Sequence, residues 1–339
     1  MGSGPVVVSE ADHGVRLDAW LHRLPPSDAD PKPAAPPGPA APPANTPEAA
    51  AAPSAGDGAA ASQAQPAEAL SRRAARTLCD LGAIAVDGVL APPEQRLRHG
   101  QTVQFAREHF ARSLQLGLAV RCDAEFALVL HKPAGLAVHG GPLVDTSVAD
   151  VLARHLPGAG LAQRLDREAS GLLLVGPTRA ALAALGAAME QGRIARTYLA
   201  VVHGEPDFEH RTVDLKLRVT DEPRGDRPKT VVDPNGQPSV SHVTVVDRRK
   251  GAALVRVRLE TGRTHQIRAH LQAIGHPLLG DPRYGDPAAN ERARGTFGIQ
   301  RTLLHCSELR LPRPDGGELV VVDWHPEEFA RLLPRLRRG

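Results

Sequence analysis

The chain has 339 residues, of which 41 are basic and 38 acidic, giving a formal charge of +3 and a sequence pI near 9.0. That length is enough for two domains with substantial cores. The three cysteines, Cys79, Cys122 and Cys306, show neither metal-ligand spacing nor a disulfide framework, and no apolar run has the length of a membrane span. The amino terminus lacks a secretory signal, so we expect a protein of the reducing cytoplasm.

Two helical stretches flank a long proline-rich segment near the amino terminus. Leu17, Leu21 and Leu24 have helical spacing and predict a short amphipathic helix over residues 15–24. Twelve prolines lie from residue 25 to residue 66 among alanine, glycine and serine, with no aromatic residue. Such a composition cannot bury enough apolar surface to offset chain entropy, so residues 25–68 are predicted to be a disordered insertion.

Order is predicted to resume at Leu70 with a second helix that ends before Gly82. Its apolar stripe is predicted to consist of Leu70, Ala74, Leu78 and Leu81. Asp87-Gly88 then separates two short apolar runs, which indicates a tight β-hairpin over residues 84–90, and another strand is expected over residues 103–105.

The segment 69–112 is locally basic, with seven arginines against four acidic residues. Arg72, Arg73 and Arg76 cluster on one face of the predicted second helix. A basic face of this kind is typical of phosphate binding, although a solvated helix face has the same composition.

The longest motif runs from Gln163 to Val175 and places Arg164 and Asp166 just before a Ser-Gly turn and an apolar run. The apolar run predicts a buried strand, so Asp166 should lie in a loop at the mouth of that strand. Arg164 and Arg167 flank Asp166, and positive charge nearby favours an ionised carboxylate. An ionised carboxylate in a cleft can act as a nucleophile or as a base.

Further elements follow this motif along the chain. A helix is predicted over residues 178–191, and Arg196-Thr197-Tyr198 opens a strand, in which a tyrosine is most simply a core residue with its hydroxyl satisfied. Residues 221–239 predict a long mobile loop, and residues 240–246 and 253–259 alternate as antiparallel strands. The run 259–270 leads into a helix that ends at Gly275. Its two histidines, His265 and His270, are five residues apart, which does not fit the metal spacing of a zinc helix and favours structural roles.

The run from Gln163 resembles the catalytic signature of RluA-class pseudouridine synthases, His-Arg-Leu-Asp-x-x-Thr-Ser-Gly-Leu, with Gln163 and Ala169 as departures. Lys132-Pro133-Ala134-Gly135, Arg196-Thr197-Tyr198 and residues 259–270 resemble further motifs of that class. Arg16-Leu17-Asp18, Ser71-Arg72 and the segment 82–88 resemble an S4 RNA-binding domain that is interrupted by the insertion.

The resemblance implies an α+β fold with a mainly antiparallel mixed sheet at residues 121–337, preceded by an S4-like module built from residues 10–24 and 69–112. It implies conversion of uridine to pseudouridine in RNA, most simply in 23S ribosomal RNA, by a monomer without a metal or cofactor. Asp166 would start the chemistry, Tyr198 would support the flipped base, Arg268 would pair with Asp166, and Arg164 would fill the vacated stack. The remaining RNA contacts would come from Arg72, Arg73, Arg76, Lys132, Arg196 and Arg263.

Three alternatives stay open at this point. The target could be a transfer RNA, or the protein could be a non-catalytic RNA-binding factor of ribosome assembly. A nucleoside or glycoside hydrolase would need a second carboxylate or a metal-bound water. The only near candidate for that carboxylate is Glu168.

Overall fold

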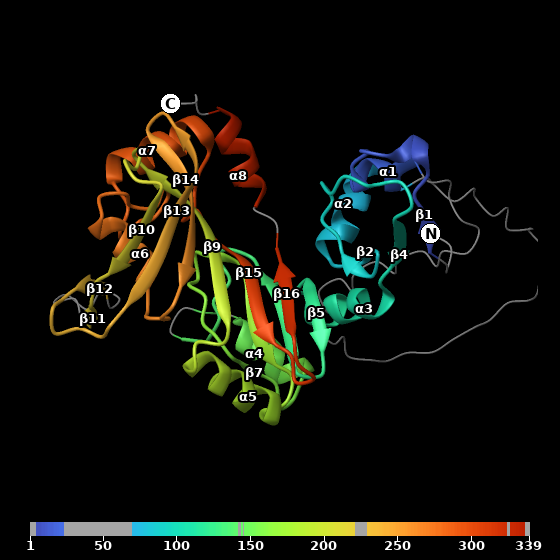
Figure 1. The fold of residues 1–339 in the computed structure, drawn as a ribbon, viewed down its shortest axis with the longest axis horizontal. Helices are drawn as coiled ribbons and strands as arrows, with labels where there is room; N and C mark the ends of the chain where they lie inside the picture. Colours follow the sequence, from blue (N-terminus) through green and yellow to red (C-terminus); the bar gives the residue numbers. More distant parts are fainter. Residues whose placement is uncertain are drawn as a thin grey trace, which may run out of the picture.

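The computed structural model describes residues 5–23, 70–141, 144, 146–220, 229–323 and 326–335. The predicted insertion, residues 25–68, therefore lies outside the described residues, as do Arg224 and Arg227 of the predicted mobile loop. None of the helices within those ranges is long and apolar enough to cross a membrane. The described chain forms a small amino-terminal module and a larger domain built on one extended sheet (Figure 1).

The module packs two helices on a small antiparallel sheet of strand order β1-β4-β2-β3. Its elements are β1 (Val6–Val7), a 3-10 turn (Glu10–Asp12), α1 (Leu17–Arg23), α2 (Arg72–Asp80), β2 (Ile84–Val86), β3 (Val89–Leu90) and β4 (Thr102–Phe105). The predicted hairpin is confirmed, because Asp87 and Gly88 have φ values of 51° and 78°, as the favoured two-residue turn requires. In α2 the fully buried residues are Ala75 and Cys79, while Leu70 and Leu78 of the predicted stripe are partly buried against the same core. Ala75 and Cys79 belong to the cluster that contains Leu17 and Leu21 of α1, against which α2 packs.

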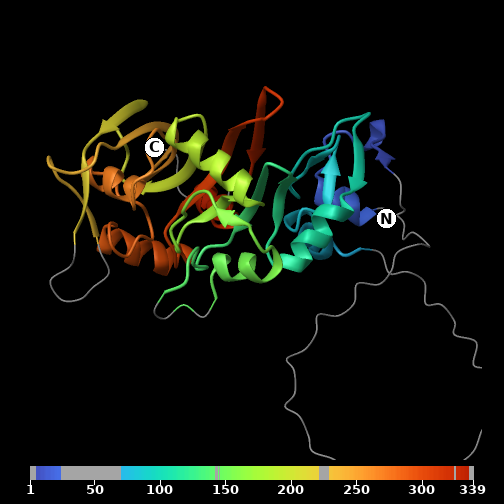
Figure 2. The ribbon, with the colours of Figure 1, turned by 90° about the horizontal axis from the view of Figure 1, so that it is seen from below.

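The module joins the large domain through a helix that the sequence did not predict, α3 (Arg107–Leu116). This helix continues past residue 112, where the module is predicted to end. Ser113 within it is fully buried; its hydroxyl donates to the Leu81 carbonyl at 2.7 Å and accepts from the Val120 amide at 3.0 Å. Figure 2 shows the module at one end of the molecule, beside the edge strand β5.

The large domain has the predicted α+β fold with a mainly antiparallel mixed sheet. This sheet has ten strands, with the main order β10-β13-β14-β9-β15-β8-β6-β5. Its strands are β5 (Val120–Ala124), β6 (Ala127–Lys132), β7 (Gly160–Leu161), β8 (Ser170–Gly176), β9 (Ala195–His203), β10 (His210–Asp214), β13 (Val240–Arg249), β14 (Ala252–Leu259), β15 (Leu304–Pro312) and β16 (Glu318–Val322). All of these pair antiparallel except β15 and β8, whose parallel pairing makes the sheet mixed.

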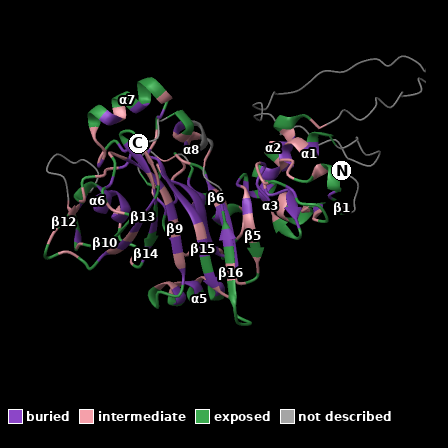
Figure 3. Cartoon of the chain, turned by 45° about the horizontal axis from the view of Figure 1, so that its top comes forward, coloured by how far each residue is buried: buried purple, intermediate pink, exposed green. Residues whose placement is uncertain are grey.

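Helices cover this sheet, whose central strands carry most of the buried residues (Figure 3). They are α4 (Val148–His155), α5 (Arg179–Glu190), α6 (Gln266–Ala273), α7 (Pro287–Phe297) and α8 (Glu327–Leu332), which is followed by a 3-10 turn (Leu333–Arg335). The predicted helix 178–191 is α5, with Thr178 as its N-cap, and the predicted helix before Gly275 is α6.

The central motif folds as predicted into a loop followed by a buried strand, and every residue of β8 is buried. Gly171 has φ +108°, and a Cβ there would lie 2.2 Å from the Cys306 carbonyl oxygen. The Ser-Gly pair therefore permits β8 to lie close beside β15, where Ser170 and Gly171 align with His305 and Cys306. This close approach fixes the direction of the loop that carries Asp166.

Of the predicted mobile loop 221–239, the structure describes residues 229–239. Its residues 229–232 form β12 (Lys229–Val232), which pairs with β11 (Leu217–Thr220) in a separate two-stranded sheet. The Thr230 amide donates to the Tyr284 hydroxyl oxygen at 2.7 Å, and the Thr230 hydroxyl donates to the Thr264 carbonyl at 2.9 Å. The strand is held by contacts with segments far away in the sequence, which the composition of the loop does not reveal.

Candidate active site

A cleft of about 690 Å³ brings together the predicted motifs around Asp166. Its walls come from the loop before β8, the first residues of β9, and the segment from Leu259 to Arg268 that leads into α6. Asp166 lines this cleft with 26% of its side chain exposed, so the carboxylate is held by the protein yet open to a ligand.

Arg268 of α6 binds Asp166 and a second carboxylate at the same time. Its Nη1 donates to Asp166 Oδ2 at 3.1 Å, while Nε and Nη2 donate to the two carboxylate oxygens of Asp281 at 2.6 and 2.8 Å. Asp281 is completely buried and also accepts the backbone amides of Arg283 and Tyr284. Burial opposes both charges, but this pairing raises the pKa of Arg268 and lowers the pKa of Asp281.

The ring of Tyr284 completes the support of Arg268. The guanidinium carbon lies 4.7 Å from the ring centroid, which is within the range of a cation–π contact. Tyr284 itself is fully buried, and its hydroxyl makes a 3.0 Å hydrogen bond with Nδ1 of His265. Arg268 is thus fixed on several sides, which fixes the carboxylate of Asp166 in turn.

His265, which is predicted to be structural, lies beside Asp166 and lines the cleft. Its Nε2 is 4.0 Å from Asp166 Oδ2, and 17% of its side chain is exposed. The residue occupies the N-cap position of α6 with φ 51°, a left-handed conformation that is rare outside glycine, and its side chain makes no capping hydrogen bond. His270, in contrast, is fully buried and binds the Ser241 hydroxyl and the Leu215 carbonyl, in agreement with a structural role.

Tyr198 and Arg196 project from the same side of β9 and line the cleft. Tyr198 is 5% exposed, and its hydroxyl interacts with the Cys306 thiol of the neighbouring strand. Burial raises the pKa of this phenol well above its usual value. The side chain is therefore neutral and can offer a ring, rather than a charge, to a molecule in the cleft.

Arg196 is only 9% exposed, and no hydrogen bond links its guanidinium to any of the described residues. A Cβ at residue 262 would lie 2.5 Å from its Nη1, so Gly262 leaves the space that the guanidinium occupies. A buried cation without a carboxylate partner is costly, and it suits a site that receives an anion.

Arg164 and Arg263 are exposed residues on the rim of the cleft. Each makes one weak contact: Arg164 Nη2 lies 3.3 Å from the Thr264 hydroxyl, and Arg263 Nε lies 3.2 Å from the Pro238 carbonyl. Gln163, which differs from the expected histidine, is buried and donates to the Leu172 carbonyl at 3.0 Å. The amide thus anchors the loop to β8.

Lys132 is placed differently from the prediction of an RNA contact. It is completely buried, and its Nζ donates to the carbonyls of Pro133, Leu136 and Arg167 at 2.8, 2.9 and 3.1 Å. Burial lowers its pKa to about 8, so the ammonium group remains mainly protonated at neutral pH. Because its three donors are occupied inside the protein, Lys132 ties the Pro133 turn to the loop that carries Asp166.

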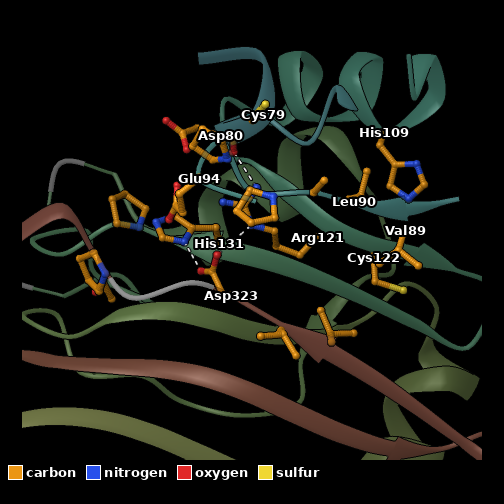
Figure 4. Close-up of a pocket in the computed structure, with 18 of the residues that line it drawn as sticks. Cys79, Asp80, Val89, Leu90, Glu94, His109, Arg121, Cys122, His131 and Asp323 are labelled. Atoms are coloured by element: carbon orange, nitrogen blue, oxygen red, sulfur yellow. Dashed lines mark hydrogen bonds and ion pairs between the residues drawn. The ribbon is translucent and has the colours of Figure 1, made fainter. Parts of the chain in front are cut away.

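The predicted basic face of α2 does not reach the Asp166 cleft. Arg72 and Arg73 are exposed, and Arg76 lines a different cavity of about 750 Å³ between the module and the sheet domain. In this second cavity, Arg121 donates to Asp323 Oδ1 at 3.0 Å and to the Asp80 carbonyl at 2.7 Å, and His131 also contacts Asp323 (Figure 4). Acidic and basic groups are mixed there, whereas the Asp166 cleft has an excess of arginines.

Comparisons with known proteins agree with this geometry. Residues 127–273 match the family described as RNA pseudouridylate synthase. Ribosomal large subunit pseudouridine synthase D of Nitrosomonas europaea is 32% identical over 277 residues, covering 75% of this chain and 77% of the relative. The chain belongs to the RNA pseudouridine synthase family.

Other relatives of this synthase lead to the same family. Ribosomal large subunit pseudouridine synthase C of Escherichia coli is 34% identical over 275 residues, covering 76% of this chain and 86% of the relative. The human RNA Pseudouridylate Synthase Domain Containing 4 structure shares the fold, with a TM-score of 0.54 at 24% identity over 67% of this chain and 97% of that one. The predicted RluA-class pseudouridine synthase is therefore confirmed, and the enzyme converts uridine to pseudouridine in RNA.

Reasoning from the sequence missed part of the synthase's site. Asp281 and Tyr284 lie between α6 and α7, outside the motifs from which the site is predicted. His265 was interpreted as structural because its spacing to His270 excluded a zinc helix. The feature that marks His265 is its positive φ at the cleft, which often indicates a functional constraint. This angle is visible only in the structure.

Proposed function

We propose that this enzyme isomerises specific uridines of 23S ribosomal RNA in the cytoplasm, acts as a monomer, and uses Asp166 to start the reaction. The observation that carries this proposal is the ion pair between Arg268 and Asp166 at the centre of an arginine-rich cleft. Curated relatives that are 32–34% identical are named as ribosomal large subunit pseudouridine synthases, which favours the large-subunit RNA over other RNAs.

The reaction breaks the C1′–N1 bond of uridine, turns the uracil and rejoins it to C1′ through C5. For this, a carboxylate must be ionised and correctly oriented before the substrate arrives. Arg268 supports both requirements, because it binds one oxygen of Asp166 while Asp281 and Tyr284 hold the guanidinium in place.

The target base must leave its stack to reach Asp166, which costs roughly a few kcal/mol. We assign the compensating contacts to three residues of the cleft. Tyr198 presents its ring for stacking, and the exposed Arg164 fills the space that the base leaves. Arg196, a buried cation without a hydrogen bond to the described residues, is placed to receive a backbone phosphate of the flipped nucleotide.

The amino-terminal module would act as an S4-like RNA-binding domain. Arg72 and Arg73 lie exposed on α2, and Arg263 extends the positive surface on the rim of the cleft. Contacts of exposed arginines with phosphates contribute affinity without reading sequence, and they weaken as salt rises. The module would therefore strengthen binding to structured RNA, while the cleft selects the uridine that reacts.

The experiment that tests this proposal is a map of pseudouridine across all RNAs in cells that lack the gene. The map is compared with those of cells restored with the wild-type protein or with Asp166→Asn. We expect discrete sites in the large-subunit ribosomal RNA to disappear and to return only with the wild-type protein. Loss of pseudouridine only from transfer RNA would contradict the proposed substrate, and restoration by Asp166→Asn would contradict the role of the aspartate.

A further inference from the structure

The isomerisation must move a proton from one atom of the uracil to another. When C5 of uracil bonds to C1′, C5 still carries its hydrogen and becomes tetrahedral. To restore the aromatic ring, that hydrogen must leave C5 as a proton, and N1 must gain one. A group in the cleft that accepts the first proton and returns it to N1 completes the isomerisation without any added reactant.

Besides Asp166, Tyr198 and the arginines, the described titratable residues of the cleft are His139, Glu190, Glu260 and His265. Among the described histidines, only His265 lies within 4.0 Å of Asp166. Tyr198 is unsuited, because its side chain is 5% exposed and burial raises the pKa of its phenol well above the usual value. Arg164, Arg196, Arg263 and Arg268 remain protonated at any physiological pH. Asp166 is already engaged by Arg268 and is required earlier in the reaction.

We propose that His265 is this second proton-transfer residue, acting beside Asp166 on the uracil. The inference rests on the proposed function, because it assigns a step of the same reaction. Nε2 of His265 lies 4.0 Å from Asp166 Oδ2, which is too far for a hydrogen bond but close enough for both groups to reach one small ring. Both residues line the same cleft.

The opposite side of the imidazole is held in place. Nδ1 lies 3.0 Å from the Tyr284 hydroxyl, and the two rings pack edge to face with centroids 5.5 Å apart. In the tautomer whose Nδ1–H donates to the Tyr284 oxygen, the lone pair of Nε2 is free to accept a proton in the cleft. Burial, followed by the nearby charge of Arg268, lowers the pKa of His265 despite the opposing effect of Asp166, so the neutral form prevails.

The backbone also indicates a functional constraint at this residue. His265 has φ 51°, in the left-handed region that is unfavourable for a residue with a Cβ. Its side chain does not cap α6, which is the usual benefit of a polar residue at this position. The strained conformation instead turns the imidazole toward Tyr284 and Asp166.

The step balances in atoms and electrons. Nε2 takes the proton of C5, and the electron pair of the C5–H bond forms the C5=C6 double bond. The π pair of C6=N1 moves onto N1, which then takes a proton from Nε2 of the imidazolium. His265 is neutral again at the end, and the uracil is joined to the ribose through carbon.

The test uses the full-length enzyme under single-turnover conditions, with RNA carrying either hydrogen or deuterium at C5 of the target uridine. His265→Asn is the main variant, because asparagine tolerates the left-handed region and keeps a polar atom near the Nδ1 position, but lacks Nε2. We expect the rate to fall by about 100-fold or more and a primary deuterium isotope effect, absent from the wild type, to appear. His270→Asn is the matched control, since this histidine of the same helix contacts Ser241 and Leu215, and it should show no isotope effect.

Each outcome decides the inference. An unchanged rate, or a slower rate without an isotope effect, would show that His265 is only structural. If the asparagine variant has no measurable turnover or does not fold, His265→Ala with added imidazole decides: recovery of turnover supports proton transfer, and no recovery contradicts it. A wild-type enzyme that forms no pseudouridine in this assay would instead contradict the proposed function, which separates the two failures.

Discussion

Asp166 and Asp281 share the guanidinium of Arg268. Asp281 accepts two of its hydrogen bonds, at 2.6 and 2.8 Å, and Asp166 accepts one, at 3.1 Å. The fully buried Asp281 therefore determines where Arg268 lies, and Arg268 determines how Asp166 faces the cleft. The second carboxylate serves as a support behind the arginine and does not line the cleft.

Asp281→Asn should impair catalysis without touching Asp166. The change leaves the positive charge of Arg268 partly uncompensated in the interior, so the free energy of unfolding should fall by about 3–5 kcal/mol. The displaced guanidinium should misorient Asp166 and lower turnover by roughly 100-fold. Chemical denaturation and single-turnover rates measure the two effects. Full activity in a folded Asp281→Asn protein would contradict the proposal that Asp281 positions Asp166 through Arg268.

Lys132→Met should reduce stability and turnover but leave RNA affinity unchanged, because the ammonium group is buried and donates to three carbonyls inside the protein. Loss of these charged hydrogen bonds should lower the free energy of unfolding by about 3 kcal/mol or more. Arg263→Met is the matched control: it removes an exposed charge on the rim, so it should weaken RNA binding without destabilising the fold. Filter-binding at two salt concentrations measures the RNA affinity of both variants, and only Arg263→Met should show a weaker affinity. Weaker RNA binding by a folded Lys132→Met protein would contradict this account and would support the predicted contact between Lys132 and RNA.

Tyr198→Phe should retain most activity, whereas Tyr198→Leu should lose it. Phenylalanine keeps the ring that faces the cleft and gives up only the contact with Cys306. Leucine removes the stacking surface, which is worth about 1–3 kcal/mol per base. Rates for both variants at saturating RNA measure the difference. Equal losses in the two variants would indicate that the hydroxyl, and not the ring, is required.

His305 should make the folded state sensitive to mild acid. It is fully buried between Ser170 and Asp323, and burial lowers its pKa from 6.5 to about 4. The unfolded chain then binds a proton at a higher pH than the folded protein does. Stability is thus complete above pH 6.5 and is lost as the pH falls toward 4, by about 3 kcal/mol in total. Denaturation curves measured between these pH values should show that the free energy of unfolding depends more strongly on pH in the wild type than in His305→Asn. The same pH dependence in both proteins would exclude this histidine as the cause.

Much of the site could be predicted because two motifs are contiguous in the sequence. The segments around Asp166 and Arg268 each carry a turn followed by a strand or helix with clear periodicity, so their local structure follows from the residues. The resemblance predicts the pairing of Arg268 with Asp166. In the structure, Nη1 of Arg268 lies 3.1 Å from Oδ2 of Asp166.

The rest depends on contacts between distant segments. β6 is buried almost throughout, and nothing in its sequence tells whether Lys132 points to solvent or to interior carbonyls. β12 is short and is held by Tyr284, which is 54 residues away, so its composition predicts only a loop. α3 is largely polar and packs through Ser113, whose burial depends on Leu81 and Val120. In each case tertiary packing overrides the local pattern.

The most direct test of the central claim compares the wild-type enzyme with Asp166→Asn on a purified 23S ribosomal RNA transcript. Asparagine has the shape of aspartate but carries no charge, and it can still accept a hydrogen bond from Arg268, so the cleft should keep its form. We predict that the wild type forms pseudouridine at discrete sites, and that Asp166→Asn forms none while binding the RNA with similar affinity. Pseudouridine formation by Asp166→Asn at the wild-type rate would contradict the account.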